Sequence, residues 1–346
     1  MGSVKSLRVE ESATESSLGR GSFVFSDDYS VFDWGKMPDE IDGKGASLCS
    51  MGAYSFELLE DEDVPTHYRG VLSDGEVVAL NETDEPTDEM AVELTQVPDL
   101  RFDETTGEYD YDAFHNEGGD NYLVPLEIVF RNAVPPGSSL RSRYEPSEVG
   151  FEADTWTEDE TVSLEEPLVE FSTKFEEKDR YLDDEEARRV SGLDEDEFET
   201  LRETARRVNE VVTEHADSVG LSHQDGKIEC LYHDGEIKVA DVVGTFDENR
   251  FLRDGVQISK EFLRQFYKTY DPDWVEAVGD AKEEADERGV ADWRGLCEVK
   301  PKPLPEDVKL IASNLYRAGA NTYTERELFE APSLDDVVER IETRID

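Results

Sequence analysis

The sequence is poor in cysteine, histidine and cationic residues. Its three cysteines, Cys49, Cys230 and Cys297, are widely spaced and form no CxxC pair, which excludes a disulfide framework and a cysteine zinc site. The five histidines are scattered and add no metal motif. Lys and Arg together number 35, against 86 Asp and Glu, so generic nucleic-acid binding through a basic surface is also excluded.

Long apolar runs are missing as well. No stretch approaches the roughly 20 apolar residues that a membrane helix needs, and the N-terminus lacks a basic-then-apolar targeting signal. We therefore expect a cytoplasmic protein that binds neither membrane nor nucleic acid.

Negative charge is what the chain has in excess. A net charge of −51 would ordinarily indicate disorder, but the 37% hydrophobic and 10% aromatic residues predict a folded chain. Its 346 residues make two domains the natural expectation. Acid-rich, lysine-poor folded chains are typical of a halophilic cytoplasm, where concentrated salt screens self-repulsion. We interpret the charge as an adaptation to the medium.

The most informative stretch is residues 221–250, which predicts a β-hairpin. Two runs of strand-like composition flank an Asp-Gly pair at 234–235, a strong turn signal. Asp225, Lys227 and Glu229 alternate along the first run, so their side chains share one face. A carboxylate–lysine–carboxylate face suits Mg²⁺ carrying a nucleotide polyphosphate.

The side taken by Asp241 depends on the turn. A two-residue turn pairs Glu229 with Ala240 and sends Asp241 to the opposite face, whereas a three-residue turn sets Asp241 across from Lys227. The three-residue register would therefore gather three carboxylates and one ammonium on a single face.

A solvated acidic hairpin is the alternative interpretation. The lysine favours a site, because no lysine occurs between Lys44 and Lys174 and a lysine among strand carboxylates is unusual for this composition. Lys44 itself, in a GKG turn, is expected to be structural.

Three other segments carry polar groups in a distinctive setting. An apolar strand beginning at Tyr122 contains Glu127 and Arg131, which predicts either a mutual salt bridge or a strand that passes a polar ligand. The Ser- and Arg-rich loop at 138–143 is either an anion cradle or a turn. A continuous helix is expected over 183–218, and another with Ser47 as its N-cap.

Four stretches in this order resemble the SAICAR synthetase (phosphoribosylaminoimidazole-succinocarboxamide synthase) family. They are SDDYSVFD with GKG at 26–45, VPLEIVFRN with GS at 124–138, EPLVEFSTKFEE at 166–177, and DGKIE with DENR at 225–250. Any one of these motifs is weak. Four with matching spacing identify the chain as a divergent member of haloarchaeal type.

The resemblance implies an ATP-dependent ligase of purine biosynthesis. It would condense L-aspartate with carboxyaminoimidazole ribotide (CAIR) and release ADP and phosphate, with Mg²⁺ as the metal. By motif position, the catalytic residues would be Lys227, Asp225 and Arg131. The nucleotide would be bound by Lys5, Leu123 (backbone to adenine), Glu127 (ribose), Lys174 and Lys227, and the substrates by Arg131, Ser138, Arg250 and Asp33. Glu229 and Asp241 would be the ligands of one or two Mg²⁺ ions.

The chain departs from the family pattern at four places. Ser3 replaces a lysine of the N-terminal phosphate loop, Asp28 an arginine, and Val242 an acidic residue, and one extra residue separates Asp241 from Arg250.

The resemblance also implies an α+β fold of two domains. Residues 1–123 would form a mainly antiparallel sheet that covers the nucleotide, and residues 124–346 a larger α+β domain, with ATP in the cleft between them. Sequence pattern alone supports only mixed strands followed by helices. The alternatives are a kinase-like phosphotransferase on a small phosphorylated acceptor and an acidic cation-buffering or interaction protein; homo-oligomerisation is left open.

Overall fold

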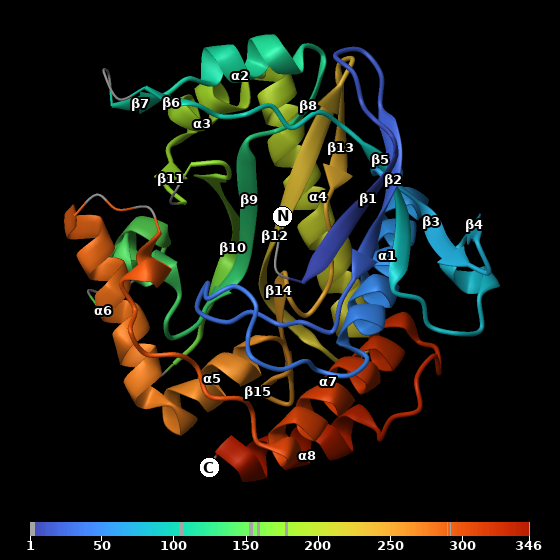
Figure 1. The fold of residues 1–346 in the computed structure, drawn as a ribbon, viewed down its shortest axis with the longest axis vertical. Coiled ribbons are helices and arrows are strands. Elements are labelled where there is room, and N and C mark those ends of the chain that lie inside the picture. The colour runs from blue at the N-terminus through green and yellow to red at the C-terminus, as the bar shows by residue number, and fades with distance from the viewer. Residues whose placement is uncertain are drawn as a thin grey trace.

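Two antiparallel sheets organise the chain, and helices cover them (Figure 1). The structure is a computed structural model that describes residues 4–103, 107–151, 155–157, 160–176, 179–288, 290 and 292–345. The expected α+β class with antiparallel sheets is confirmed. Ser3 lies outside the described residues.

The first sheet has five strands in the order β1-β2-β5-β3-β4. Their bounds are Lys5–Glu11 (β1), Gly19–Phe25 (β2), Tyr68–Ser73 (β3), Glu76–Val78 (β4) and Glu89–Leu94 (β5). Helix α1 (Lys44–Asp61) packs on this sheet. The predicted N-cap is wrong: the helix begins after Gly43, at φ 79°, and the Ser47 hydroxyl donates to the Gly43 carbonyl inside the first turn (2.8 Å).

The second sheet has the order β11-β10-β9-β12-β14-β15, and β8 and β13 also pair with β12. The bounds are Asn121–Leu123 (β8), Leu126–Val134 (β9), Val162–Thr173 (β10), Tyr181–Leu182 (β11), Ser222–His233 (β12), Glu236–Ala240 (β13), Asn249–Arg253 (β14) and Val256–Gln257 (β15). Strand β12 is central, because it pairs with β9 and β14 along its first half and with β8 and β13 along its second.

The strand predicted from Tyr122 is two strands. The ladder is interrupted at Val124 and Pro125, between β8 and β9, because proline has no N–H to donate. The Val124 N–H instead donates to the Cys230 carbonyl of β12 (2.9 Å).

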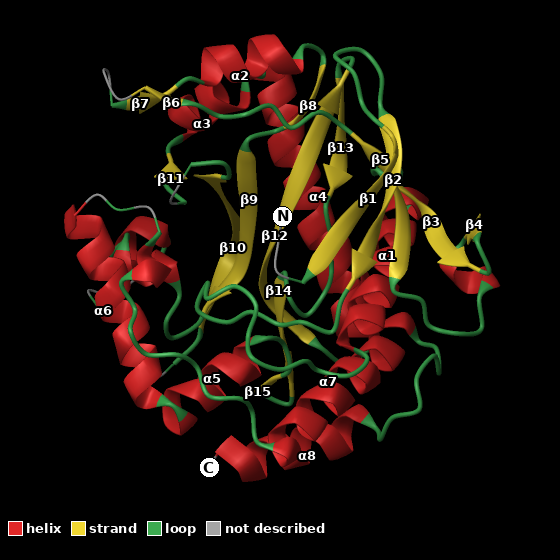
Figure 2. Cartoon of the chain, in the orientation of Figure 1, coloured by secondary structure: helices red, strands yellow, loops and turns green. Residues whose placement is uncertain are grey.

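The continuous helix expected over 183–218 is also divided. Helix α3 (Asp184–Ser191) ends at Gly192, which has φ 74°, and α4 (Glu195–Ser218) begins after Asp194, whose carboxylate caps the Glu197 N–H (2.9 Å). A left-handed glycine followed by a capping box ends one helix and starts another. Helix α4 covers one face of the second sheet (Figure 2), and its apolar stripe is buried.

The remaining regular elements of the described chain are two short strands and five α-helices. They are β6 (Phe102–Asp103), β7 (Glu108–Tyr109), α2 (Tyr111–Gly118), α5 (Glu261–Tyr270), α6 (Pro272–Arg288), α7 (Glu306–Thr324) and α8 (Leu334–Ile345). Buried apolar side chains of both sheets belong to one continuous core, and the division at residue 123 stays a prediction. Among the described helices, none combines the length and apolarity needed to cross a membrane.

Candidate active site

The predicted hairpin is formed by β12 and β13, and its turn has two residues, the shorter of the two alternatives. His233 pairs with Glu236, so the turn holds only Asp234 (φ 48°) and Gly235 (φ 83°). Two left-handed residues match the twist of a hairpin, and the three-residue register is therefore wrong. In the observed register Glu229 pairs with Ala240.

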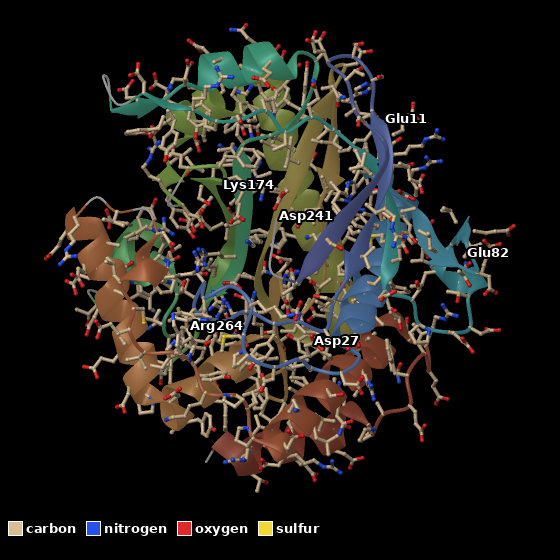
Figure 3. The ribbon with its side chains drawn as sticks, in the orientation of Figure 1. Glu11, Asp27, Glu82, Lys174, Asp241 and Arg264 are labelled. Atoms are coloured by element: carbon tan, nitrogen blue, oxygen red, sulfur yellow. The ribbon has the colours of Figure 1, made fainter. Side chains whose placement is uncertain are left out.

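Asp241 nevertheless joins the face that carries Glu229. Strand β13 ends at Ala240, and Asp241 has φ 64°, so the backbone turns out of the ladder before the alternation would carry its side chain away. Lys5, from β1 of the other sheet, lies 2.7 Å from Asp241 Oδ1. Figure 3 shows Asp241 and Lys174 near each other at the centre of the molecule.

Two carboxylates therefore share one buried environment, and their proton affinities diverge. Burial and the charge of Asp241 raise the pKa of Glu229 to about 7, although Lys174 forms an ion pair with it. Burial alone would also raise the pKa of Asp241, but the charge and hydrogen bond of Lys5, with Lys174 nearby, lower it. Like charges held close in a buried site cannot ionise equally.

Within the described part of the chain, Glu229 and Asp241 are a pair of carboxylates without a third ligand. Across the described residues, no group of three or more His, Cys, Asp or Glu is arranged to hold a metal ion. Mg²⁺ usually binds through one or two carboxylates plus substrate phosphates. This donor set therefore fits Mg²⁺ that arrives with a nucleotide.

Lys227 lies beside this pair on β12. Its Nζ is 2.8 Å from Glu127 Oε1 on β9 and 3.6 Å from Glu248 Oε2, and its side chain is 40% exposed. Burial would lower its pKa, but the charges of Glu248 and Glu127 raise it. Lys227 is therefore a permanent cation that a ligand can reach.

A buried charge network occupies the other half of β12. Arg131, on β9 directly opposite Asp225, is 2% exposed. Its Nε donates to Glu170 (2.6 Å), and its Nη1 donates to Asp225 and to the Ser138 hydroxyl (3.3 Å each). Arg250, opposite Asp225 on β14, donates two hydrogen bonds to it (2.8 and 2.5 Å). The salt bridge between Glu127 and Arg131, one of the two alternatives for this strand, is not formed, and Glu127 pairs with Lys227 instead.

Sequence reasoning missed several members of this network. Glu170 lies in the motif at 166–177, but the sequence predicts no role for it. Tyr181 accepts a hydrogen bond from Arg131 (3.1 Å). Arg143 stacks on the Tyr181 ring (3.4 Å from its centroid) and donates to Glu170 (2.6 Å). Arg141 of the same loop donates instead to main-chain carbonyls outside the network. The anion-cradle interpretation of this loop stays a prediction.

The remaining candidates lie at the margins. Leu123 pairs with Leu231 on β12, beyond Glu229. Asp33 lies in the β2–α1 loop, is 76% exposed and pairs with Lys282 of α6 (2.6 Å). Lys44 is structural as expected, since it is fully buried and pairs with Asp247 (2.7 Å).

Comparisons with known proteins agree on one family. The family model described as SAICAR synthetase matches residues 13–281. A putative phosphoribosylaminoimidazole-succinocarboxamide synthase of Archaeoglobus fulgidus is 43% identical over 344 residues, covering 99% of this chain and 98% of the relative. The Thermoplasma acidophilum phosphoribosylaminoimidazole-succinocarboxamide synthase is 30% identical over 308 residues, covering 85% of this chain and 90% of the relative.

Solved structures support the fold. SAICAR synthase from Saccharomyces cerevisiae complexed with SAICAR gives a TM-score of 0.60 at 20% identity, with 94% of each chain covered. A SAICAR synthetase in complex with ADP gives a TM-score of 0.55 at 22% identity, with 88% of this chain and 99% of that chain covered.

Proposed function

Because the chain belongs to the SAICAR synthetase family, we propose that it joins L-aspartate to the carboxylate of CAIR in a reaction driven by ATP. The products are SAICAR, ADP and phosphate. The enzyme is a carbon–nitrogen ligase of purine biosynthesis.

One observation carries the proposal: strand β12 bears both halves of the site. Asp225 binds Arg131 and Arg250. Lys227 and Glu229 belong to the carboxylate–lysine cluster, which consists of Lys5, Glu127, Lys174, Lys227, Glu229 and Asp241. The four residue steps from Asp225 to Glu229 span about 13 Å of strand. A nucleotide at one half can therefore present its γ-phosphoryl group to an acceptor held at the other.

The chemistry requires this adjacency. A carboxylate is a poor acyl donor, so ATP first phosphorylates it, and the amine of aspartate then displaces phosphate as the carbon–nitrogen bond forms. Such catalysis depends mainly on positioning and charge neutralisation. Lys227 supplies a cation where the phosphoryl group passes, and Arg131 and Arg250 suit bidentate contacts to the carboxylate or phosphate of the ribotide.

The nucleotide side is assigned to residues of both sheets. Glu229 and Asp241 would hold Mg²⁺, which supplies further charge neutralisation when it is bound with the triphosphate. Lys5 and Lys174, now paired with these carboxylates, would contact phosphate oxygens. The contact between Lys5 and Asp241 joins the two sheets, which supports residues 1–123 as the part that covers the nucleotide.

The margins of the site complete the assignment. The Leu123 backbone would contact adenine and Glu127 the ribose, while Ser138 and Asp33 would serve the substrates. The acidic composition supports a cytoplasm of high salt as the place of action.

ADP release in multimolar KCl tests the ligase directly. With Mg²⁺, ATP and CAIR, release should require L-aspartate. Lys227→Met should lower the rate at least about 100-fold, because a charge that acts on the transferring phosphoryl group is lost. Lys238→Met is the matched control, since Lys238 lies on the same hairpin but pairs with Glu93 outside the site (2.8 Å).

Other outcomes separate the alternatives. ADP release that needs CAIR but not aspartate would identify a phosphotransferase. Folded protein that releases no ADP under either condition would contradict an active ligase.

A further inference from the structure

Lys260 has an environment unlike that of the other lysines. Among the described lysines that are not fully exposed, every one makes an ion pair except Lys260. Its backbone N–H donates to the Phe246 carbonyl (3.1 Å) at the start of α5. An ammonium without an ion-pair partner is unexpected in a chain with a net charge of −51.

The two carboxylates whose charges act on Lys260, Asp247 and Glu248, already have other partners. Asp247 accepts from Lys44 and from the Tyr316 hydroxyl (2.7 Å each). Glu248 lies 3.6 Å from Lys227. Burial lowers the pKa of Lys260 even though the charges of Asp247 and Glu248 oppose the shift. The lost hydration of this ammonium is therefore only partly compensated within the protein, and a bound anion would supply the rest.

A second cation lies on the same side of α5. Arg264 follows Lys260 by four residues, and i,i+4 positions are neighbours on a helix surface. Arg264 pairs with Glu261 (3.1 Å) and remains about one-third exposed. It is labelled in Figure 3 below the carboxylate–lysine cluster.

Asp33 is a carboxylate on which the charges of these two cations act. Partial burial alone would raise its pKa, but the hydrogen bond from Lys282 and the charges of Lys282, Arg264 and Lys260 lower it. The loop that carries Asp33 contacts α5 directly, since the hydroxyls of Tyr29 and Tyr267 lie 2.9 Å apart. Phe32 and Asp33 both have positive φ (55° and 58°), an uncommon conformation that tends to occur at functional sites.

We propose that Lys260 and Arg264 bind the two carboxylates of the amine donor and that Asp33 accepts a hydrogen bond from its ammonium. The inference rests on the proposed ligase function and identifies where aspartate enters. A dicarboxylate amino acid is an anion at neutral pH, and a strongly acidic protein repels it. Lys227 lies close enough to Lys260 for its charge to act on it, so the donor would sit beside the group assigned to the phosphoryl transfer.

Steady-state kinetics of one substitution tests the assignment. Lys260→Met should raise the KM for L-aspartate at least about tenfold, while the KM values for ATP and CAIR stay within about twofold. Lys260→Arg should restore most of the affinity, since it returns the charge. Lys268→Met is the control, because Lys268 lies on the same helix but is exposed and has no ion pair among the described residues.

A second measurement separates binding from a structural role. Discrimination between L-aspartate and L-asparagine in kcat/KM should fall in Lys260→Met, because the side-chain carboxylate loses its partner. The same discrimination is measured for Arg264→Met, which replaces Lys260→Met as the test if that variant does not fold. A shift of the thermal unfolding temperature by ADP with Mg²⁺ shows that each variant is folded.

The outcomes distinguish this inference from the function on which it rests. Wild-type protein that shows no aspartate-dependent ADP release would overturn both. Active wild type, together with an unchanged aspartate KM in folded Lys260→Met and Arg264→Met, would overturn the inference alone. A raised KM for CAIR instead of aspartate would also overturn it, because Lys260 would then serve the ribotide.

Discussion

Arg131 is the single residue on which most of the buried charge depends. It contacts Glu170 and Asp225 at once while being 2% exposed. Burial would lower its pKa, but the charge of Glu170, with Tyr181 and Asp225, raises it. The guanidinium therefore stays charged and holds two carboxylates that would otherwise repel each other.

Removing this guanidinium should destabilise the protein. Arg131→Met leaves Glu170 and Asp225 buried with fewer partners, so the unfolding free energy should fall by about 3–5 kcal/mol. Arg206→Met on the exposed face of α4 should change it by about 0.5 kcal/mol or less. Urea unfolding in concentrated KCl compares the two variants, and a loss below about 1 kcal/mol for Arg131→Met would contradict the buried network.

His223 makes stability depend on pH. The ring is 6% exposed, with its Nδ1 2.8 Å from the Thr213 hydroxyl and its Nε2 3.0 Å from the Asn249 side-chain oxygen. Burial lowers its pKa to about 4, below the usual 6.5. Above pH 6.5 the ring is neutral in both folded and unfolded states, whereas between pH 6.5 and 4 only the unfolded chain takes up the proton.

Acidification should therefore reduce stability at pH values above the range in which ordinary carboxylates titrate. His223 should remove about 2 kcal/mol of unfolding free energy between pH 7 and pH 5. His223→Gln has no such group, so the difference between wild type and variant should shrink as the pH falls. Chemical unfolding at several pH values measures this difference, and a gap independent of pH would show that His223 titrates normally.

Strand β12 is the element that aligns both halves of the site, and Gly226 lets its neighbours approach. Gly226 separates Asp225 from Lys227. A methyl group there would lie 2.5 Å from the Phe130 ring and would overlap the Asn249 side chain. Only glycine permits this spacing of β9, β12 and β14.

Gly226→Ala should consequently displace the strand. We expect a loss of about 2 kcal/mol or more in unfolding free energy and a lower rate of ADP release. Gly279→Ala, in helix α6, is the control: a methyl group there meets nothing within 4 Å, so it should stabilise by about 0.5–1 kcal/mol. Thermal unfolding of both variants provides the comparison, and equal effects would argue against close strand packing at Gly226.

The molecule as a whole is held together across its two sheets at the site. The His67 N–H donates to the Val239 carbonyl (3.0 Å) and the Val239 N–H to the Pro65 carbonyl (2.9 Å), which ties the segment before β3 to β13. The ion pair of Lys5 with Asp241 lies beside this connection. These contacts act against the self-repulsion of a chain with a net charge of −51.

Salt should therefore stabilise the molecule. Raising KCl from about 0.1 M to 3 M shortens the Debye length to a few ångströms, and we expect the melting temperature to rise by roughly 10 °C or more. Calorimetry measures the shift, and sucrose, which does not screen charge, is the control. Equal melting temperatures at both KCl concentrations would contradict adaptation to high salt.

Local physics made part of this protein predictable. The period of a strand placed Asp225, Lys227 and Glu229 on one face, and an Asp-Gly pair located the hairpin, because both depend only on neighbouring residues. The ends of helices and strands were less predictable. Gly192 and Pro125 divide elements that the apolar pattern alone predicts as continuous.

Contacts between distant segments were decided only by the folded chain. Asp241 reaches the site because β13 ends one residue before it and a left-handed backbone redirects its side chain. The in–out alternation of side chains along a strand does not predict this direction. Glu170 matters because it faces Arg131 from a third strand, β10. Lys260 matters because it has no ion-pair partner among the described residues. Such pairings depend on which chain segments pack together, so they follow from the tertiary structure and not from any local pattern.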